Sequence, residues 1–217
     1  MGRGGSKAGG GTGGTGGLKA GNIVSTRDLV SERGANRQGV DEVLSTSSDV
    51  TEMYGKENIG DFEVAKLKGR QKNTVMAYYD GKNVAINENF FDSAKMTAAY
   101  DDCVETGFHP SRGNKTGLEA VTAHELGHLL TDKVGEKMGV GKGIGNINQA
   151  ASNILKEAKT EAGHNSIYSM AKKISRYAEY NHAETIAEAF ADVYCNGGKA
   201  KKESTAIVNV INKYLKS

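Results

Sequence analysis

The sequence predicts an α+β fold in which a small β-hairpin or sheet precedes a mostly helical domain. Two β-rich runs, 74–79 and 83–90, flank the turn Asp80-Gly81-Lys82, as expected of a hairpin. Helical patterning dominates from Ser93 onward, and no segment repeats. The chain has 217 residues, enough for one domain with a core, or one domain plus a tail.

The N-terminal part of the chain predicts two further segments. The first 21 residues contain eleven glycines, three basic residues and no acid. Such a segment buries too little apolar surface to offset its ordering entropy, so we predict a disordered glycine-rich tail over 1–21. Residues 22–69 are polar, with weak helical patterning at Ser25–Arg33 and Asp41–Tyr54, and we assign them to an N-terminal helical or cap segment. Residues 70–217 form the remaining domain.

Six helices are predicted after the hairpin. The segment GFHPSRGN contains the only proline and separates the first helix from the second, and the glycine-rich GVGKGIGN separates the second from the third. The expected ranges are Ser93–Glu105, Thr116–Val134, Asn148–Thr160, Ser166–Tyr177, Ala183–Cys195 and Lys202–Leu215.

Composition excludes several classes of protein. The net charge is only +2, so no strong overall field attracts nucleic acid or a membrane surface. Cys103 and Cys195 form neither a disulfide framework nor a CxxC metal motif. No apolar run is long enough to span a bilayer, so we expect no membrane partner.

The predicted helix AVTAHELGHLLTDKV carries the residues most typical of a catalytic metal site. Residues four apart share one helix face, so His124 and His128 can bind one Zn²⁺ through their ring nitrogens. Glu125 lies about 100° further round the helix, which suits a general base better than a ligand. The other residues are largely apolar, and a buried helix carries polar groups only at a cost unless they have partners. The alternative is a chance match of the HExxH pattern.

A catalytic zinc site needs a third protein ligand. The histidines available are His109, His164 and His182, each beside turn residues or a helix end. Carboxylates are available in the segment RYAEYNHAETIAEAFADVYCNG, residues 176–197.

An acidic stripe runs along the last of these segments. Glu184, Glu188 and Asp192 recur every four residues on a helix that is otherwise apolar. Stacked carboxylates repel one another, and a cation, or histidines bound to a cation, would relieve the repulsion. Alternatively, Asn181 caps the helix with Glu184 in a capping box, and the other acids pair with lysines.

Together, AHELGHLL and SRYAEYNHAETIAEAFADVY resemble the catalytic domain of anthrax lethal factor and its relatives. These relatives include the clostridial Pro-Pro endopeptidases and peptidase-like domains attached to phage head proteins. The family pattern is HExxH, then a tyrosine, a glutamate seven residues later and another glutamate four residues after that. Tyr177, Glu184 and Glu188 stand at these spacings, and the similarity extends from about Thr74 to Cys195. The resemblance implies a zincin-type domain that hydrolyses peptide bonds with zinc.

The same resemblance implies the ligand set and the base. His124, His128 and Glu184 would bind Zn²⁺, and Glu125 would be the general base that activates water. No other cofactor is expected.

It also implies two supporting roles. Tyr177 would donate a hydrogen bond to the developing oxyanion, with Tyr180 as the alternative donor. Glu188 would accept from a histidine ring and fix its orientation. The chain departs from the family at Thr185 and Ile186, where relatives usually carry aromatic residues. A thermolysin-like register, with Glu188 as the ligand and Asp192 as its supporting acid, is the alternative.

We therefore expect a metalloendopeptidase whose peptide or protein substrate lies along an edge strand near residues 74–90. One alternative is a catalytically silent zincin-like domain that serves assembly in a phage head or a toxin. Another is a nucleic-acid-associated protein that acts through the basic tail. The N-terminus lacks the apolar core of a signal peptide, so we expect synthesis in the cytoplasm, and virion association or export would use a dedicated route.

Overall fold

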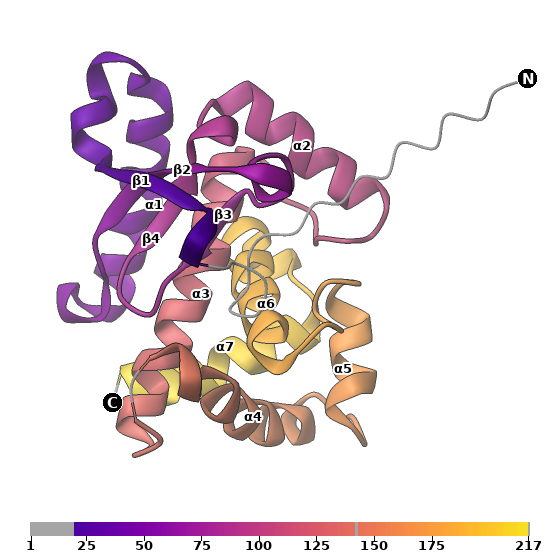
Figure 1. Cartoon of the computed structure of the whole chain (residues 1–217). Helices are drawn as coiled ribbons and strands as arrows, with labels where there is room; N and C mark the ends of the chain where they lie inside the picture. The colour runs from indigo at the N-terminus through magenta and orange to yellow at the C-terminus, as the bar shows by residue number, and fades with distance from the viewer. Residues whose placement is uncertain (1–19, 142, 217) are drawn as a thin grey trace, which may run out of the picture.

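The computed structural model describes residues 20–141 and 143–216. It confirms the predicted α+β class: a small mixed sheet lies beside a larger helical part (Figure 1). The predicted disordered tail lies outside the described residues, apart from its last two positions. No helix within the described ranges is long and apolar enough to cross a membrane.

Four strands form one sheet in the order β1-β2-β4-β3. Their bounds are β1 Ile23–Asp28, β2 Phe62–Leu67, β3 Ala77–Tyr79 and β4 Val84–Asn87. Only β2 and β4 run parallel, and the other two pairs are antiparallel. The predicted hairpin is confirmed as β3 and β4, although both strands are shorter than expected. In its turn, the Asp80 carboxylate accepts from the backbone N–H groups of Lys82 and Asn83 at 2.8 and 2.6 Å.

The prediction of a helix at Ser25–Arg33 is wrong. Its first half is the edge strand β1, which pairs with β2, and a short 3₁₀ helix follows at Leu29–Gly34. Asp28 separates the two because its carboxylate accepts from the N–H of Val30 at 2.9 Å. An edge strand with most residues solvent-accessible shows no alternation of apolar and polar residues, so the pattern that predicts strands is missing. Residues 22–69 thus contribute two strands of the sheet.

Seven α-helices are described. They are α1 (Arg37–Tyr54), α2 (Ser93–Glu105), α3 (Gly117–Lys137), α4 (Ile144–Glu161), α5 (Ile167–Ile174), α6 (His182–Asn196) and α7 (Lys202–Leu215). The helices predicted from Ser93 onward are confirmed, with shifts at their ends. The largest shift that concerns the site is in α5, which ends at Ile174 because Ser175 is extended. Tyr177 therefore lies in a turn and not on a helix.

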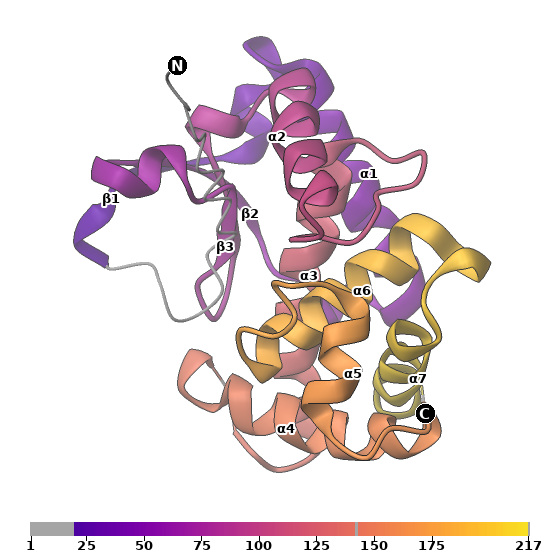
Figure 2. The same cartoon turned by 90° about the vertical axis from the view of Figure 1, so that its right-hand side faces the viewer.

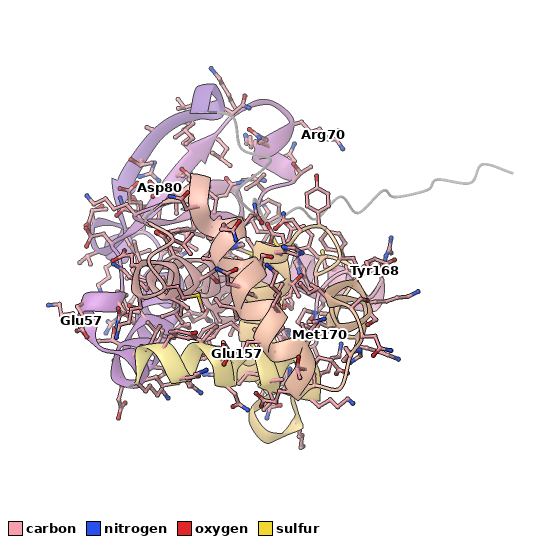
Figure 3. All side chains as sticks on the ribbon, turned by 90° about the horizontal axis from the view of Figure 1, so that it is seen from below. Glu57, Arg70, Asp80, Glu157, Tyr168 and Met170 are labelled. Carbon is pink, nitrogen blue, oxygen red and sulfur yellow. The ribbon has the colours of Figure 1, made fainter. Side chains whose placement is uncertain are left out.

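Helices α3 and α6 lie side by side in the middle of the molecule, between the sheet and α4 (Figure 2). Helix α5, which carries the Tyr168 and Met170 labelled in Figure 3, packs against α6 and α7. It exposes Tyr168, 61% accessible, and buries Met170 completely. The segment that follows α5 turns back toward the centre of the molecule, where the backbone N–H of Tyr177 donates to the carbonyl oxygen of Phe108.

The approach of α3 to α6 depends on a glycine. A Cβ atom at Gly127 would lie 2.8 Å from the Cα of Ala187 and 3.1 Å from the Cβ of Phe190, both on α6. Backbone atoms cannot move aside as a flexible side chain can, so any larger residue would force the helices apart.

We expect Gly127→Ala to lower the free energy of unfolding by roughly 1–3 kcal/mol, because overpacking between two buried helices outweighs the better helix propensity of alanine. Chemical denaturation measures this change. Gly145→Ala is the matched control: Gly145 is also helical, but a Cβ there meets nothing within 4 Å. That control should gain about 0.5–1 kcal/mol. Equal stability gains in the two variants would contradict the close contact.

Candidate metal centre

Helix α3 places the two histidines of the HExxH motif on one buried face. The helix begins with a capping box in which Thr116 and Glu119 exchange side-chain and backbone hydrogen bonds. His124 and His128 are 1% and 0% exposed, and their ring centroids lie 5.0 Å apart. The prediction that His124 and His128 lie on the same side of their helix is confirmed.

Helix α6 brings a carboxylate to both rings. Oε2 of Glu184 lies 3.2 Å from Nε2 of His124 and 3.4 Å from Nε2 of His128. The Asn181 side chain caps α6 by accepting from the backbone N–H of Glu184 at 3.0 Å, but among the described residues neither Glu184 oxygen accepts a hydrogen bond from the cap in return. The Glu184 carboxylate therefore faces the histidines instead of completing a capping box.

The electrostatics of Glu184 follow from these neighbours. Burial opposes its ionisation, but the positive charge of His128 and His124 outweighs burial and lowers the pKa of the carboxyl to about 2. Apart from these two ion pairs, neither oxygen of Glu184 and neither ring nitrogen of His128 has a well-formed hydrogen bond within the described part of the chain. Buried polar atoms without partners are costly, so these atoms call for a ligand of their own.

A zinc ion fits this arrangement. Its usual donors are imidazole nitrogen and carboxylate oxygen, bound at about 2.0–2.2 Å. Donors bound to one tetrahedral ion at such distances lie roughly 3.3 Å from each other. The separations of 3.2 and 3.4 Å between Glu184 and the two histidines match that spacing.

Glu125 lies next to the same site. One of its carboxylate oxygens and one nitrogen from each of His124 and His128 lie within 4.8 Å of one another. Both oxygens are buried, and among the described residues their one polar contact from the sheet is the backbone N–H of Tyr79, which does not reach good hydrogen-bond geometry. Burial raises the pKa of Glu125 to about 7, against the lowering effect of the two histidines. A carboxyl group with such a pKa can accept and release a proton near neutral pH.

Glu188 supports the site from the next turn of α6. Its Oε1 lies 2.8 Å from Nδ1 of His124 and 2.9 Å from Nδ1 of His109. Its Oε2 accepts a hydrogen bond of 2.7 Å from the hydroxyl of Ser175. Burial opposes ionisation of Glu188, but His109 and His124 outweigh it and hold the pKa below its usual range.

His109 and Ser175 are residues that sequence analysis missed. The sequence offers His109 only as one of several possible third ligands, whereas in the structure it is 3% exposed and contacts the acid that supports His124. Its distance from Glu188 along the chain is 79 residues, and no spacing rule connects GFHPSRGN with the HExxH motif. Ser175 had no motif to mark it. Only its position at the end of a predicted helix could have drawn attention to it.

Tyr177 lies over the ring of His124. Their ring centroids are 5.9 Å apart and nearly parallel, at 23°. The backbone N–H of Tyr177 donates to the carbonyl oxygen of Phe108 at 3.1 Å, and the two aromatic rings stack at 4.8 Å. Tyr180, the alternative donor, is 75% exposed and its ring lies 6.1 Å from that of Tyr177. Tyr177 is thus the tyrosine next to the histidines.

The other candidates lie elsewhere. Asp192 accepts from the backbone N–H of Lys201 and from the side chain of Asn196, so this third acid of the stripe is satisfied away from the histidines. His164 pairs with Glu203 at 2.8 Å. His182 begins α6 and is partly exposed.

The edge strand β3 is anchored to the helix that carries the motif. The hydroxyl of Tyr79 donates to the buried Asp132 carboxylate of α3 at 3.0 Å. Asp132 also accepts from the backbone N–H of Gly143, before α4, at 2.8 Å. The end of β3 is thereby fixed beside α3, and the backbone of Tyr79 approaches the Glu125 carboxylate.

Comparison with known proteins gives one match. The model of Peptidase family M48 matches residues 49–217, which is more than half of the chain. No curated protein and no solved structure matches. The match supports the predicted metallopeptidase domain, whereas the lethal-factor-like subtype and the phage context stay predictions. The chain therefore belongs to peptidase family M48 and is a zinc metallopeptidase, a hydrolase that uses Zn²⁺ and acts on peptides or proteins.

Proposed function

We propose that this chain is a zincin-type metalloendopeptidase in which His124, His128 and Glu184 hold the Zn²⁺ and Glu125 is the general base. The observation that carries the proposal is the position of Glu184, whose Oε2 lies 3.2 and 3.4 Å from the two Nε2 atoms. This spacing matches donors that share one tetrahedral zinc ion. The buried atoms of Glu184, His128 and Glu125 that lack a well-formed hydrogen bond among the described residues support it further.

The lethal-factor-like register of the ligands is part of this proposal. In the thermolysin-like alternative, Glu188 would be the ligand and Asp192 its support. Against that alternative, Glu188 contacts Nδ1 of His124, the opposite side of the ring from Glu184, and Asp192 is bound elsewhere. In favour of the first register, Tyr177 stands seven residues before Glu184 and lies over His124.

The residues of the chain divide the reaction between them. Zinc, when bound, acts as a Lewis acid that polarises the scissile carbonyl and makes water more acidic. Glu125 takes the proton from the attacking water and later gives it to the leaving nitrogen. Burial raises the pKa of Glu125, which helps it to hold the proton between the two transfers, and the charge of a bound Zn²⁺ would act in the opposite direction.

Tyr177 and Glu188 prepare the site for this step. Tyr177 donates a hydrogen bond from its hydroxyl to the carbonyl oxygen of the substrate as negative charge develops there. Its stacking on His124 and Phe108 holds the ring in place before substrate arrives. Glu188 keeps the Nδ1 side of His124 occupied and leaves the Nε2 side facing Glu184.

The substrate binds as an extended strand beside β3. In the sheet order β3 is an edge strand, and Tyr79 fixes its end next to α3. In the antiparallel pairing with β4, Asn87 donates to Met76 and Asp80 donates to Asn83, so the alternation directs the backbone groups of Ala77 and Tyr79 away from β4. Ala77 and Tyr79 are themselves buried, at 0% and 4% exposed, so strand addition requires that the cover of this edge move aside to admit a peptide.

Zinc content tests the ligand assignment. Wild type should bind about one Zn²⁺ per chain, and His124→Ala and Glu184→Ala should lose it. Glu188→Ala should retain zinc with roughly 10- to 100-fold weaker affinity, because it removes only a supporting contact. Elemental analysis and chelator competition measure both quantities. Loss of zinc in Glu188→Ala with retention in Glu184→Ala would establish the thermolysin-like register instead.

The catalytic roles predict variants that keep zinc and lose turnover. We expect Glu125→Gln to lower kcat by roughly 10²–10⁴-fold through loss of the base. Tyr177→Phe should lower it by about 10²–10³-fold through loss of the oxyanion donor. Cleavage of a mixed peptide library, followed by mass spectrometry, provides the assay.

Tyr180→Phe is the matched control for Tyr177→Phe, because it removes a hydroxyl from a nearby exposed ring, and it should leave kcat unchanged. Full activity of Glu125→Gln would contradict the proposal. So would zinc-loaded wild type that cleaves no peptide in the library.

Strand addition predicts an effect on KM. Ala77→Pro removes a backbone N–H that points away from β4, so the sheet keeps its own hydrogen bonds. Loss of one hydrogen bond to the substrate should raise KM by roughly 3- to 10-fold. Zinc content should stay at the wild-type level. An unchanged KM in a folded, zinc-containing variant would place the substrate elsewhere.

A further inference from the structure

A buried histidine that the proposed reaction does not use lies behind the zinc ligands. The ring of His109 stacks on Tyr100 at a centroid distance of 5.0 Å and an angle of 6°. Its other side meets the ring of Tyr177 edge-on at 5.5 Å. Nδ1 points to Glu188 at 2.9 Å. A polar ring so enclosed has one orientation available, and its hydrogen bond fixes the direction of Nδ1.

Glu188 is the group on which these contacts converge. The same oxygen, Oε1, contacts Nδ1 of His109 and Nδ1 of His124, and Oε2 accepts from Ser175. An ionised carboxylate can only accept hydrogen bonds, so both Nδ1 atoms carry the proton. In the neutral form of His124, the form that binds a metal, this tautomer leaves the lone pair on Nε2, the nitrogen that faces Glu184.

The segment that contains His109 also holds the segment that contains Tyr177. The backbone N–H groups of Arg176 and Tyr177 donate to the carbonyl oxygens of Gly107 and Phe108, at 2.9 and 3.1 Å. Ser175 joins both structures, since its hydroxyl donates to Glu188 and accepts from the backbone N–H of Ala178 at 3.0 Å. The support of His124 and the support of Tyr177 are therefore one hydrogen-bonded unit.

We infer that His109 is a positioning residue of the metal centre: by donating from Nδ1 to Glu188, it holds that carboxylate in the orientation that directs Nε2 of His124 toward the zinc site. Without this donor, Oε1 of Glu188 loses one of its two buried partners and is free to turn away from His124. The inference rests on the proposed zinc site and adds a residue that contacts neither metal nor substrate.

The test compares two residues of nearly equal shape at this position. Asparagine can place its Nδ2–H₂ near the position of the histidine Nδ1, whereas leucine has the same branching without a donor. Both variants lose the ring that stacks on Tyr100, so the difference between their zinc affinities reports the contribution of the hydrogen bond to Glu188. The measurement is the zinc dissociation constant of the full-length chain, obtained by chelator competition.

We expect His109→Leu to bind zinc roughly 10- to 100-fold more weakly than wild type, as when a group supporting a metal ligand is lost. His109→Asn should recover most of that affinity. In a Glu188→Ala background, His109→Leu should add no further loss, because the group through which it acts is absent. If His109→Leu does not fold, His109→Phe provides a second variant without the donor that keeps an aromatic ring. It should bind zinc as weakly as is expected of His109→Leu.

Equal zinc affinity in His109→Asn and in the donor-free variant would overturn the inference, whether that affinity is high or low. A further loss of affinity on top of Glu188→Ala would overturn it as well. If wild type itself binds no zinc, the proposed function fails together with the inference. If wild type binds zinc and His109→Leu or His109→Phe binds it equally well, the inference fails alone.

Discussion

The close contact between α3 and α6 is the constraint on which the site depends. Two histidines on one helix cannot complete a catalytic zinc site, because a third ligand has to come from another element. Gly127 lets the backbone of α6 approach α3 one residue before His128. The Glu184 carboxylate then lies 3.2 and 3.4 Å from the histidine nitrogens. A side chain at position 127 would widen this spacing, and the donors would no longer match the size of the ion.

This packing also concentrates ionisable groups in the interior, where charge is expensive. The two sides of the cluster meet that cost differently. On the Nδ1 side of His124, protein donors satisfy Glu188, which contacts two histidines and a serine. On the Nε2 side, Glu184, His128 and Glu125 retain buried atoms without a well-formed hydrogen bond among the described residues. Around Glu188, Nε2 of His109 also lacks one in the described part of the chain, but most of the unsatisfied polar atoms lie on the side where a cation would bind.

The parts of the site that sequence predicts are those with local periodicity. Spacing of four residues on a helix is enough to bring His124 and His128 to one face, and the apolar residues around them indicate burial. The same reasoning identifies α6 as a second buried helix with acids on one stripe. Periodicity alone makes Glu184 and Glu188 equally available. The family resemblance and the spacing from Tyr177 favour Glu184, and the packing of the two helices brings its carboxylate near both Nε2 atoms.

The rest depends on contacts between distant parts of the chain. His109 reaches Glu188 across 79 residues, and its surroundings come from α2, α6 and the turn that holds Tyr177. The prediction for the residues of strand β1 is wrong for a related reason. Backbone pairing with β2 defines this strand, and its side chains, mostly exposed, carry no alternation. Ser175 shows how one residue ends a helix that the pattern would continue, because its extended backbone places the hydroxyl on Glu188.

The most direct measurement of the central claim is X-ray absorption at the zinc edge of the zinc-loaded wild-type chain. It reports which atoms surround the metal without relying on activity or on any variant. Around the zinc ion we expect two imidazole nitrogens at about 2.0–2.1 Å, oxygen donors at about 2.0–2.2 Å and no sulfur. A shell with three imidazoles, or one containing sulfur, would place zinc at other residues. It would then contradict the claim that α3 and α6 together form the metal centre.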